Sequence, residues 1–465
     1  MVNIEIGERK SEIRVFRDRI TPDWNLRNGT VKKNNRKIKR IVVLALLPFS
    51  LMLGMISCGD GPRVHHGLGE EQEEVVELVL WSIATETDAF HQSYLNAIAA
   101  FEEANPGVRI RFETFDNESY KTKIRLAVAT NELPDIFFTW GGGFSRPFVS
   151  SGKVLHLEDV YEEFSEELDM NVLSNVTFDG RIYGSVTTTP ISVTFYNRGI
   201  FRDHGLEAPE TWEELVYICQ VLIDAGITPM GISAKDSWVL AMLFDGIALK
   251  TVGSQQFQRV LVERGESFNS QGFLEAAKKF RELVDMGAFV ERANFISNDE
   301  ASAQFFAGEV AMFTTGSWLA GSIQTDATNP EDFGLFPIPV INPRYATITD
   351  FMGGGSDTLM VSATTQHPDL AKRAVFLLTR SISKYAYLDG AGIPAWRIDF
   401  DDSGVNPLTR EVADFAATAT SFTLWADTLM EADDASVYLT LLQELYLGRI
   451  EPEEFVRAMA NQLGR

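Results

Sequence analysis

The chain has 465 residues, two of them cysteine, and carries 41 basic against 65 acidic side chains for a formal net charge of −24. This length is enough for two lobes with sizeable cores. The negative charge argues against binding to nucleic acid or to anionic lipid headgroups, and two cysteines exclude a fold held by a disulfide framework.

The N-terminal part of the chain has the pattern of an export signal. Residues 32–40 (KKNNRKIKR) hold six basic side chains and no acidic one, and an apolar run of 16 residues follows, from Ile41 to Ile56. A membrane-spanning helix needs about 20 such residues. The run is therefore short, and its flanks match the charged and apolar regions of a secretory signal.

The apolar run ends at Ile56-Ser57-Cys58-Gly59, which resembles the bacterial lipobox, in which the cysteine is lipidated and becomes the new N-terminus after cleavage. Each buried CH₂ of an acyl chain contributes about 0.8 kcal/mol, so several chains on one cysteine hold a protein at a membrane surface. We predict a lipoprotein signal peptide at residues 31–57 and lipidation, such as palmitate, at Cys58. An uncleaved signal anchor is the alternative. Residues 1–30 are interpreted as a mis-assigned start or a leader extension.

Residues 58–76 are rich in Gly, His and Glu without an apolar period, which predicts a flexible tether. Residues 1–57 hold 12 basic and 5 acidic side chains, so residues 58–465 keep 29 and 60, a net charge of −31. We expect an exported monomer, facing the periplasm or the extracellular side and attached to the membrane only through Cys58. The adjacent His65 and His66 are too little to predict a metal site, and no cofactor is expected.

After the tether the sequence alternates between two periods. Apolar side chains recur every second residue in the predicted strands and with a helical period between them. In chain order the pattern predicts a strand at 77–83, a helix at 88–104, a strand at 108–113, a helix at 120–130 and a strand at 135–140. Alternation of this kind predicts a parallel α/β sheet with helices on its faces.

The alternation of strand and helix patterns continues to the C-terminus. Thr211 is placed as the N-cap of a helix. Further elements are predicted as strand pieces within 182–197, helices at 212–225 and 273–286, strands at 310–314 and 357–361, a helix at 367–380 and helical structure over the last 45 residues.

Six segments occur in the order in which they occur in a known family. The segments are FEEANPGVRIRFETF, LPDIFFTWGGG, DGRIYGSVTTTPISVTFYNRGIFRDHGLEAPETWEEL, GEVAMFTTGSWLAG, FGLFPIPV and GGGSDTLMVSATTQHPDLAKRAVFLL. With these segments the sequence resembles the extracellular solute-binding proteins of ABC importers, in the sugar-binding group that includes maltose-binding protein.

The resemblance implies a two-lobe α/β fold, the type II fold of periplasmic binding proteins, with a mainly parallel sheet flanked by helices in each lobe. Residues 77–190 plus 352–390 would form the first lobe, and residues 191–351 plus 391–465 the second. The chain would cross between lobes near Pro190 and near Gly353–Gly355, where glycine permits a sharp bend, and once more before the C-terminal helices.

The function implied by the resemblance is that of an ABC transporter's substrate-binding lipoprotein. Two lobes would close on a small solute, a mono- or oligosaccharide, and deliver it to the transmembrane permease subunits. A lipoprotein that presents its ligand to a membrane sensor kinase is an alternative with the same fold. An enzyme is not expected, because the sequence contains no G-x-S-x-G elbow, P-loop or G-x-G-x-x-G motif. A glycosidase carboxylate pair is not excluded by counting.

Ligands of open α/β sheets bind beyond the carboxyl ends of the strands. A sugar site there needs flat aromatic rings for C–H faces and polar groups for hydroxyls. Tryptophans at loop starts and carboxylates after strands meet this need; the resemblance adds that Trp318 lies where the family commonly stacks a sugar. Gly141–Gly143 would offer backbone N–H donors. The predicted ligand-binding residues are Trp81, Glu86, Trp140, Trp238, Trp318, Asp357 and Trp396.

Overall fold

The computed structural model describes residues 75–168 and 170–464, which belong to one unit, residues 71–465. The predictions for residues 1–57, for Cys58 and for the tether up to residue 74 lie outside the described residues. Within the described ranges, no helix combines the length and the apolar character needed to cross a membrane.

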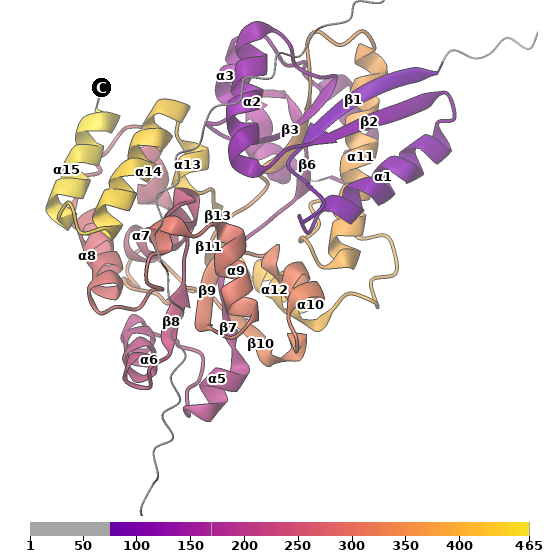
Figure 1. Ribbon diagram of the computed structural model, residues 1–465. Helices are drawn as coiled ribbons and strands as arrows, with labels where there is room; N and C mark the ends of the chain where they lie inside the picture. The colour runs from indigo at the N-terminus through magenta and orange to yellow at the C-terminus, as the bar shows by residue number, and fades with distance from the viewer. Residues whose placement is uncertain (1–74, 169, 465) are drawn as a thin grey trace, which may run out of the picture. The chain divides into compact units, whose positions relative to one another are not determined.

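The first lobe is built on a five-stranded sheet with the order β2-β1-β3-β12-β6 (Figure 1). Its strands are β1 (Val76–Ser82), β2 (Val108–Thr114), β3 (Ile136–Trp140), β6 (Gly184–Thr188) and β12 (Asp357–Val361). β1 is parallel to β2 and β3, whereas β12 is antiparallel to β3 and β6. Asp357 therefore starts β12 opposite Trp140 and Thr188, so these three residues share one edge of the sheet.

Helices cover both faces of this sheet. α1 packs on α11, and Figure 1 shows the two side by side, with α2 and α3 across the strands from them. The helices and short elements of this lobe are α1 (His91–Ala104), α2 (Asn117–Thr130), α3 (Arg146–Ser150), α4 (Glu158–Tyr161), α11 (Pro368–Asp389), the 3₁₀ turns 162–164 and 170–176, and a hairpin of β4 (Thr177–Phe178) and β5 (Arg181–Ile182).

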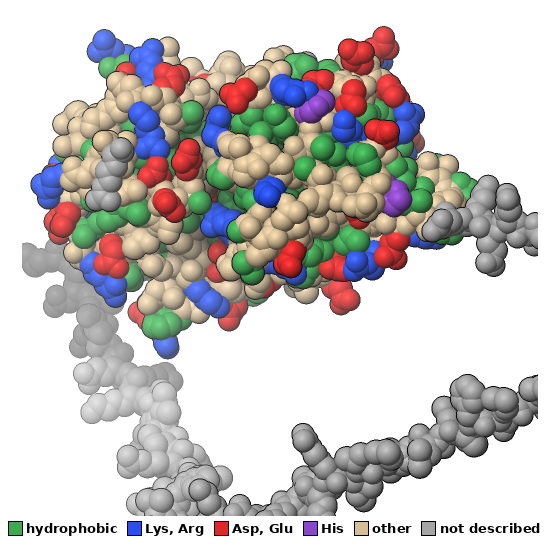
Figure 2. Space-filling view, turned by 90° about the horizontal axis from the view of Figure 1, so that it is seen from above, with side chains coloured by type: hydrophobic (Ala, Val, Ile, Leu, Met, Phe, Trp, Pro, Cys, Tyr) green, Lys and Arg blue, Asp and Glu red, His purple; other side chains and the backbone are tan. Residues whose placement is uncertain are grey.

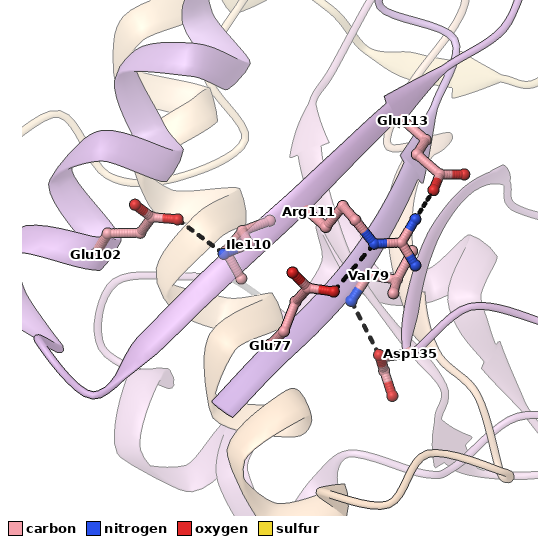
Figure 3. A network of polar contacts seen from close by, with 7 residues as sticks. All are labelled: Glu77, Val79, Glu102, Ile110, Arg111, Glu113 and Asp135. Atoms are coloured by element: carbon pink, nitrogen blue, oxygen red, sulfur yellow. Dashed lines mark hydrogen bonds and ion pairs between the residues drawn. The ribbon is translucent and has the colours of Figure 1, made fainter. Parts of the chain in front are cut away.

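Polar side-chain contacts connect β1 to β2 and to the start of β3 (Figure 3). Arg111 on β2 is paired with Glu77 on β1, with Nε 3.1 Å from Oε1, and with Glu113. The carboxylate of Asp135, just before β3, accepts the Val79 N–H at 2.9 Å. These bonds hold β1, β2 and β3 in register, so the carboxyl ends of the three parallel strands lie at the same edge.

The second lobe has a four-stranded sheet with the order β10-β7-β9-β8. Its strands are β7 (Ser192–Asn197), β8 (Thr228–Gly231), β9 (Val310–Gly316) and β10 (Phe333–Phe336). Only β8 and β9 are parallel, since β7 is antiparallel to both β9 and β10. The two-lobe α/β fold is confirmed, but the expectation of a mainly parallel sheet is wrong for this lobe. β7 enters it from the other lobe, so the helical connections do not fix its direction.

Helices surround this second sheet. They are α5 (Arg198–Asp203), α6 (Trp212–Asp224), α7 (Ser237–Leu261), α8 (Gln271–Asp285), α9 (Asn298–Phe306), α10 (Leu319–Asp326), α12 (Pro407–Ala417), α13 (Ala426–Leu429), α14 (Ala432–Tyr446) and α15 (Pro452–Leu463), with 3₁₀ turns at 293–295 and 330–332. Thr211 caps α6 as predicted, because its Oγ1 accepts the Glu214 N–H and the Glu214 carboxylate accepts the Thr211 N–H. The last 45 residues are not all helical. β13 (Ser421–Thr423) lies among them and pairs with β11 (Asp350–Met352).

The chain passes from the first sheet to the second between Thr188 and Ser192, and returns between Met352 and Asp357. The two crossings touch, because the Gly354 N–H donates to the Pro190 carbonyl at 2.9 Å. A Cβ at Gly353, whose φ is 138°, would lie 2.1 Å from that same carbonyl oxygen. Glycine is therefore required where the crossings meet.

Each lobe has its own hydrophobic core. Ala395 and Trp396 belong to the core of the first lobe, whereas Leu408 on α12 belongs to that of the second. Ile393 also belongs to the core of the second lobe, so residues 391–408 contribute to both cores, and the boundary at residue 390 stays a prediction. Figure 2 shows acidic and basic side chains interspersed over one face of the described part.

Candidate functional site

A cavity of about 1030 Å³ lies where the two lobes face each other. The first lobe contributes the residues that follow β1 and β3, the end of β6 and the start of β12. The second lobe contributes the N-terminal end of α7, α9 along its length, the residues after β9, and α13. This volume is at the upper end of the range of about 300–1,000 Å³ for small-molecule sites.

Three tryptophans line the cavity from the second lobe. Trp238 lies in the first turn of α7, Trp318 lies two residues after β9, and Trp425 precedes α13. The ring centroids of Trp238 and Trp318 are 6.4 Å apart, and those of Trp318 and Trp425 are 6.3 Å apart. We call this continuous row of indoles the tryptophan floor. Flat apolar rings of this kind can pack against the C–H faces of a sugar.

The position of Trp318 depends on the glycine that ends β9. A Cβ built on Gly316 would lie 2.0 Å from Cζ3 of the Trp318 ring and 2.2 Å from Cη2. The indole thus folds back over the backbone of Gly316, where any side chain would displace it.

Four carboxylate side chains line the cavity from the first lobe, those of Asp88, Asp116, Glu118 and Asp357. Asp88 precedes α1 and Asp357 begins β12, and the Tyr94 hydroxyl lies with them in the lining. The pKa of Asp357 is raised to about 7, mainly by burial and to a smaller extent by the charge of Asp88, against the hydrogen bond from the Ser356 hydroxyl, which lowers it. We call Asp88 and Asp357 the carboxylate wall.

Asp88 also interacts with the opposite lobe. Burial raises the pKa of Asp88 to about 6, although its carboxylate accepts the Phe90 N–H at 2.8 Å. The charge of Asp299, on α9 of the second lobe, adds to this increase. Closing the lobes therefore brings like charges together, which a bound ligand that donates hydrogen bonds would relieve.

Two amide oxygens of residues in the lining accept no hydrogen bond within the described part of the chain. They are the Oδ1 atoms of Asn117 on α2 and Asn298 on α9, and both atoms are buried. A buried acceptor without a partner costs free energy, so hydroxyl groups of a ligand would stabilise this arrangement from both lobes. Across residues 75–168 and 170–464, no group of three or more potential metal-ligating side chains is assembled.

The structure brings four of the seven predicted site residues together. Trp140, Trp238, Trp318 and Asp357 line the cavity. The Trp140 ring is braced edge-on by Phe144 at 4.9 Å and by Phe138 at 5.1 Å, and the Lys121 ammonium lies 5.6 Å from its centroid.

The other three predicted residues are not among those that line the cavity. Trp396 is buried in the core of the first lobe, where its Nε1 donates to the Val186 carbonyl at 3.0 Å and its ring packs on Phe164. Trp81 packs beneath the Lys123 ammonium at 4.1 Å and lines a separate cavity of about 310 Å³. Glu86 lies exposed in the turn after β1.

The glycines after β3 have a different role from the one expected. The Gly141 N–H donates to the Ser356 carbonyl at 2.8 Å, and the Gly142 N–H donates to the Asn175 carbonyl at 2.7 Å. A Cβ at Gly143 would lie 2.3 Å from the Leu429 carbonyl oxygen. These glycines permit close backbone packing, and the first two N–H groups are not free for a ligand.

Sequence reasoning did not select Asp88, Asp299 or Trp425. Asp88 follows the first strand, as Glu86 does, but only the structure shows which of the two carboxylates turns inward. Asp299 lies within the Ser297–Glu300 capping box that opens α9, so this motif could have located it. Trp425 lies in a stretch predicted to be helical and carries no loop signal.

Comparison with known proteins identifies the family of the chain. The family of bacterial extracellular solute-binding proteins matches residues 84–382. An uncharacterized ABC transporter extracellular-binding protein of Pyrococcus horikoshii is 27% identical over 362 residues, 75% of this chain and 79% of that protein. The multiple sugar-binding protein of Streptococcus mutans is 23% identical over 358 residues, 73% and 80% of the two chains.

A solved structure from work on xylan utilization by the thermophilic bacterium Caldanaerobius polysaccharolyticus is 32% identical to this chain. It superposes with a TM-score of 0.80 and covers 83% of this chain and 100% of its own. The chain belongs to the bacterial extracellular solute-binding proteins. The predicted family is confirmed, and this membership supports a binding role in place of catalysis.

Proposed function

We propose that this protein captures a neutral oligosaccharide between its lobes and delivers it to the permease of an ABC importer. The observation that carries the proposal is the pairing of the tryptophan floor with the carboxylate wall across one cavity. Sugar rings would stack on Trp318 and its neighbours while their hydroxyls donate to Asp88 and Asp357. A ligand that contacts both walls stabilises the closed arrangement through bonds that an open one lacks.

The charges around the cavity support a ligand without negative charge. The lining holds eight carboxylate side chains, among them Asp236, Asp299 and Asp427, but only two ammonium groups, those of Lys121 and Lys235. A uronic acid or a sugar phosphate would meet net repulsion. The volume supports an oligosaccharide over a single ring, because a cavity of about 1030 Å³ exceeds what one drug-sized ligand needs.

Delivery to a permease is supported by the relatives. The Pyrococcus horikoshii protein is named as a component of an ABC transporter, and the Streptococcus mutans protein as a binder of multiple sugars. A Kd near micromolar corresponds to about −8 kcal/mol. A few stacked rings and several hydrogen bonds can supply this free energy.

The direct test is a thermal-shift screen of the purified protein, followed by titration calorimetry. The panel contains neutral tetrasaccharides (xylotetraose, cellotetraose and maltotetraose), a uronic-acid tetrasaccharide and the corresponding monosaccharides. We expect at least one neutral oligosaccharide to bind, with the acidic one at least tenfold weaker. Tightest binding by the acidic sugar, or turnover of any sugar in the panel, would contradict the proposal.

We further propose that lipid at Cys58 keeps the acidic binding lobes near the permease. Cys58→Ala should release a protein that retains ligand affinity but loses its association with the membrane fraction. The measurement is fractionation of cells followed by calorimetry on the released protein. A Cys58→Ala variant that stays membrane-bound after signal cleavage would contradict the anchor.

A further inference from the structure

Helix α7 places one buried carboxylate directly behind the tryptophan floor. Trp238 and Met242 line the cavity from the first part of this helix. Asp245 follows Trp238 by seven residues, two turns of helix, and thus lies on the same side of α7. Its side chain is fully buried, and it is absent from the residues that line the cavity.

The Asp245 carboxylate has two partners, both from the C-terminal part of the chain. Its Oδ2 accepts the backbone N–H of Ala426 at 2.8 Å, and its Oδ1 accepts the Tyr438 hydroxyl at 2.5 Å. A carboxylate in an apolar interior is costly unless hydrogen bonds hold it. Both of its oxygen atoms are used, so Asp245 ties α7 to the start of α13 and to α14.

The bond to Ala426 fixes the residue beside it. Trp425 is the third indole of the floor, and its Nε1 donates to the Ser192 hydroxyl at 2.8 Å. Ser192 begins β7, directly after the first crossing between the lobes. Trp425 is therefore held from both ends, by Asp245 through the backbone and by Ser192 through the ring.

The same segment reaches the first lobe. The Thr428 carbonyl on α13 accepts the Phe144 N–H at 3.3 Å, and Phe144 braces the Trp140 ring. Residues 425–428 thus contribute to the floor, to the cavity lining and to the contact between lobes.

We propose that Asp245 is a positioning residue for ligand binding, which acts by setting the place of Trp425 in the tryptophan floor. This inference rests on the proposed function, because it assigns Trp425 a ligand contact. The structural part of this inference, that Asp245 fixes the position of the Trp425 ring, can be tested without any ligand.

The variant is Asp245→Asn, which keeps the shape but replaces one acceptor oxygen with an amide nitrogen. One of the two donors, Ala426 N–H or Tyr438 O–H, then loses its acceptor. Tyr438→Phe removes only the hydrogen bond from the Tyr438 hydroxyl to Asp245. It replaces Asp245→Asn in the experiment if that variant does not fold. Trp212→Phe is the matched control, because it removes the partly buried bond from the Trp212 Nε1 to Glu282 in the same lobe, and Trp212 does not line the cavity.

The first measurement is the near-ultraviolet circular dichroism of Trp425, obtained as the difference between each protein and its Trp425→Phe counterpart. We expect this difference to fall by at least half in Asp245→Asn and to persist in Trp212→Phe, with far-ultraviolet spectra unchanged in both. A Trp425 spectrum that stays intact in Asp245→Asn and in Tyr438→Phe would overturn the inference.

The second measurement is a double-mutant cycle in affinity for xylotetraose, cellotetraose and maltotetraose. Asp245→Asn should weaken binding three- to tenfold in the parent but less than twofold in a Trp425→Ala background. Equal losses in both backgrounds would overturn the action through Trp425. If Trp425→Ala itself leaves affinity unchanged while the spectrum responds to Asp245, the ligand contact of the proposed function fails and the anchoring of Trp425 stands.

Discussion

The two lobes contribute different clusters of side chains to the cavity. The three indoles in a row come from the second lobe, whereas Asp88 and Asp357, both with raised pKa values, come from the first. Each lobe also adds groups of the other kind, Trp140 from the first and Asp299 and Asp427 from the second. Stacking on indoles depends little on pH and discriminates weakly among sugars, while carboxylates respond to pH and to the direction of hydroxyls. The tryptophan floor would therefore supply affinity, and the carboxylate wall would supply orientation and charge selection.

The largest effect is expected from the wall, in Asp357→Asn. The folded-state pKa of Asp357 is raised from 3.8 to about 7, so between about pH 4 and 7 the folded chain holds a proton that the unfolded chain has released. The parent therefore loses stability as pH rises through this window, and Asp357→Asn does not. The variant should be equal to the parent near pH 3.5 and gain up to about 4 kcal/mol at neutral pH.

Denaturant unfolding from pH 3.5 to 8 measures this difference, with Glu86→Gln as a control in the exposed turn. A stability gain that is constant across the pH range, or one that shrinks toward neutral pH, would contradict the raised pKa. It would also remove the contrast between the two walls.

The floor gives the next largest effect, in Trp318→Ala. Removing the central indole should weaken binding of the neutral oligosaccharide at least tenfold, about 1.4 kcal/mol or more, because its stacking surface is lost. Calorimetry at pH 5.5 and 7.5 should give the same loss at both values. A loss of affinity that depends strongly on pH would mean that the tryptophan floor and the carboxylate wall do not act separately. Unchanged affinity would show that Trp318 does not contact the ligand.

The smallest effect is expected from Gly316→Ala. The added methyl group would meet the Trp318 ring at 2.0 Å, so the ring has to move while the strand persists. Affinity should fall several-fold, and the tryptophan emission should shift. In a Trp318→Ala background the same substitution should change affinity less than twofold; an undiminished loss there would show that Gly316 acts by another route.

The location of the cavity could be predicted from the sequence because it follows from strand direction. The carboxyl ends of β1 and β3 lie beside the start of β12, and this edge carries Trp140 and Asp357. Trp318 could be predicted as a site residue for a similar reason, because it follows a strand and a glycine.

The remaining assignments depended on packing that no local pattern records. Trp396 follows Gly-Ile-Pro and looks like a loop residue, but its Nε1 bond to Val186 and the Phe164 ring bury it. Trp425 lies beside a helix of only four residues, and it reaches the cavity because Asp245, 180 positions earlier in the chain, holds its neighbour Ala426. Contacts between residues so far apart are visible only in the folded chain.

The central claim is that a ligand lies between the tryptophan floor and the carboxylate wall. A crystal structure of the complex with the tightest-binding neutral oligosaccharide tests it most directly. We expect a sugar ring stacked on Trp318, with hydroxyls within hydrogen-bond distance of Asp88 or Asp357. A ligand bound outside this cavity, or inside it without contact to either carboxylate, would overturn the proposed site.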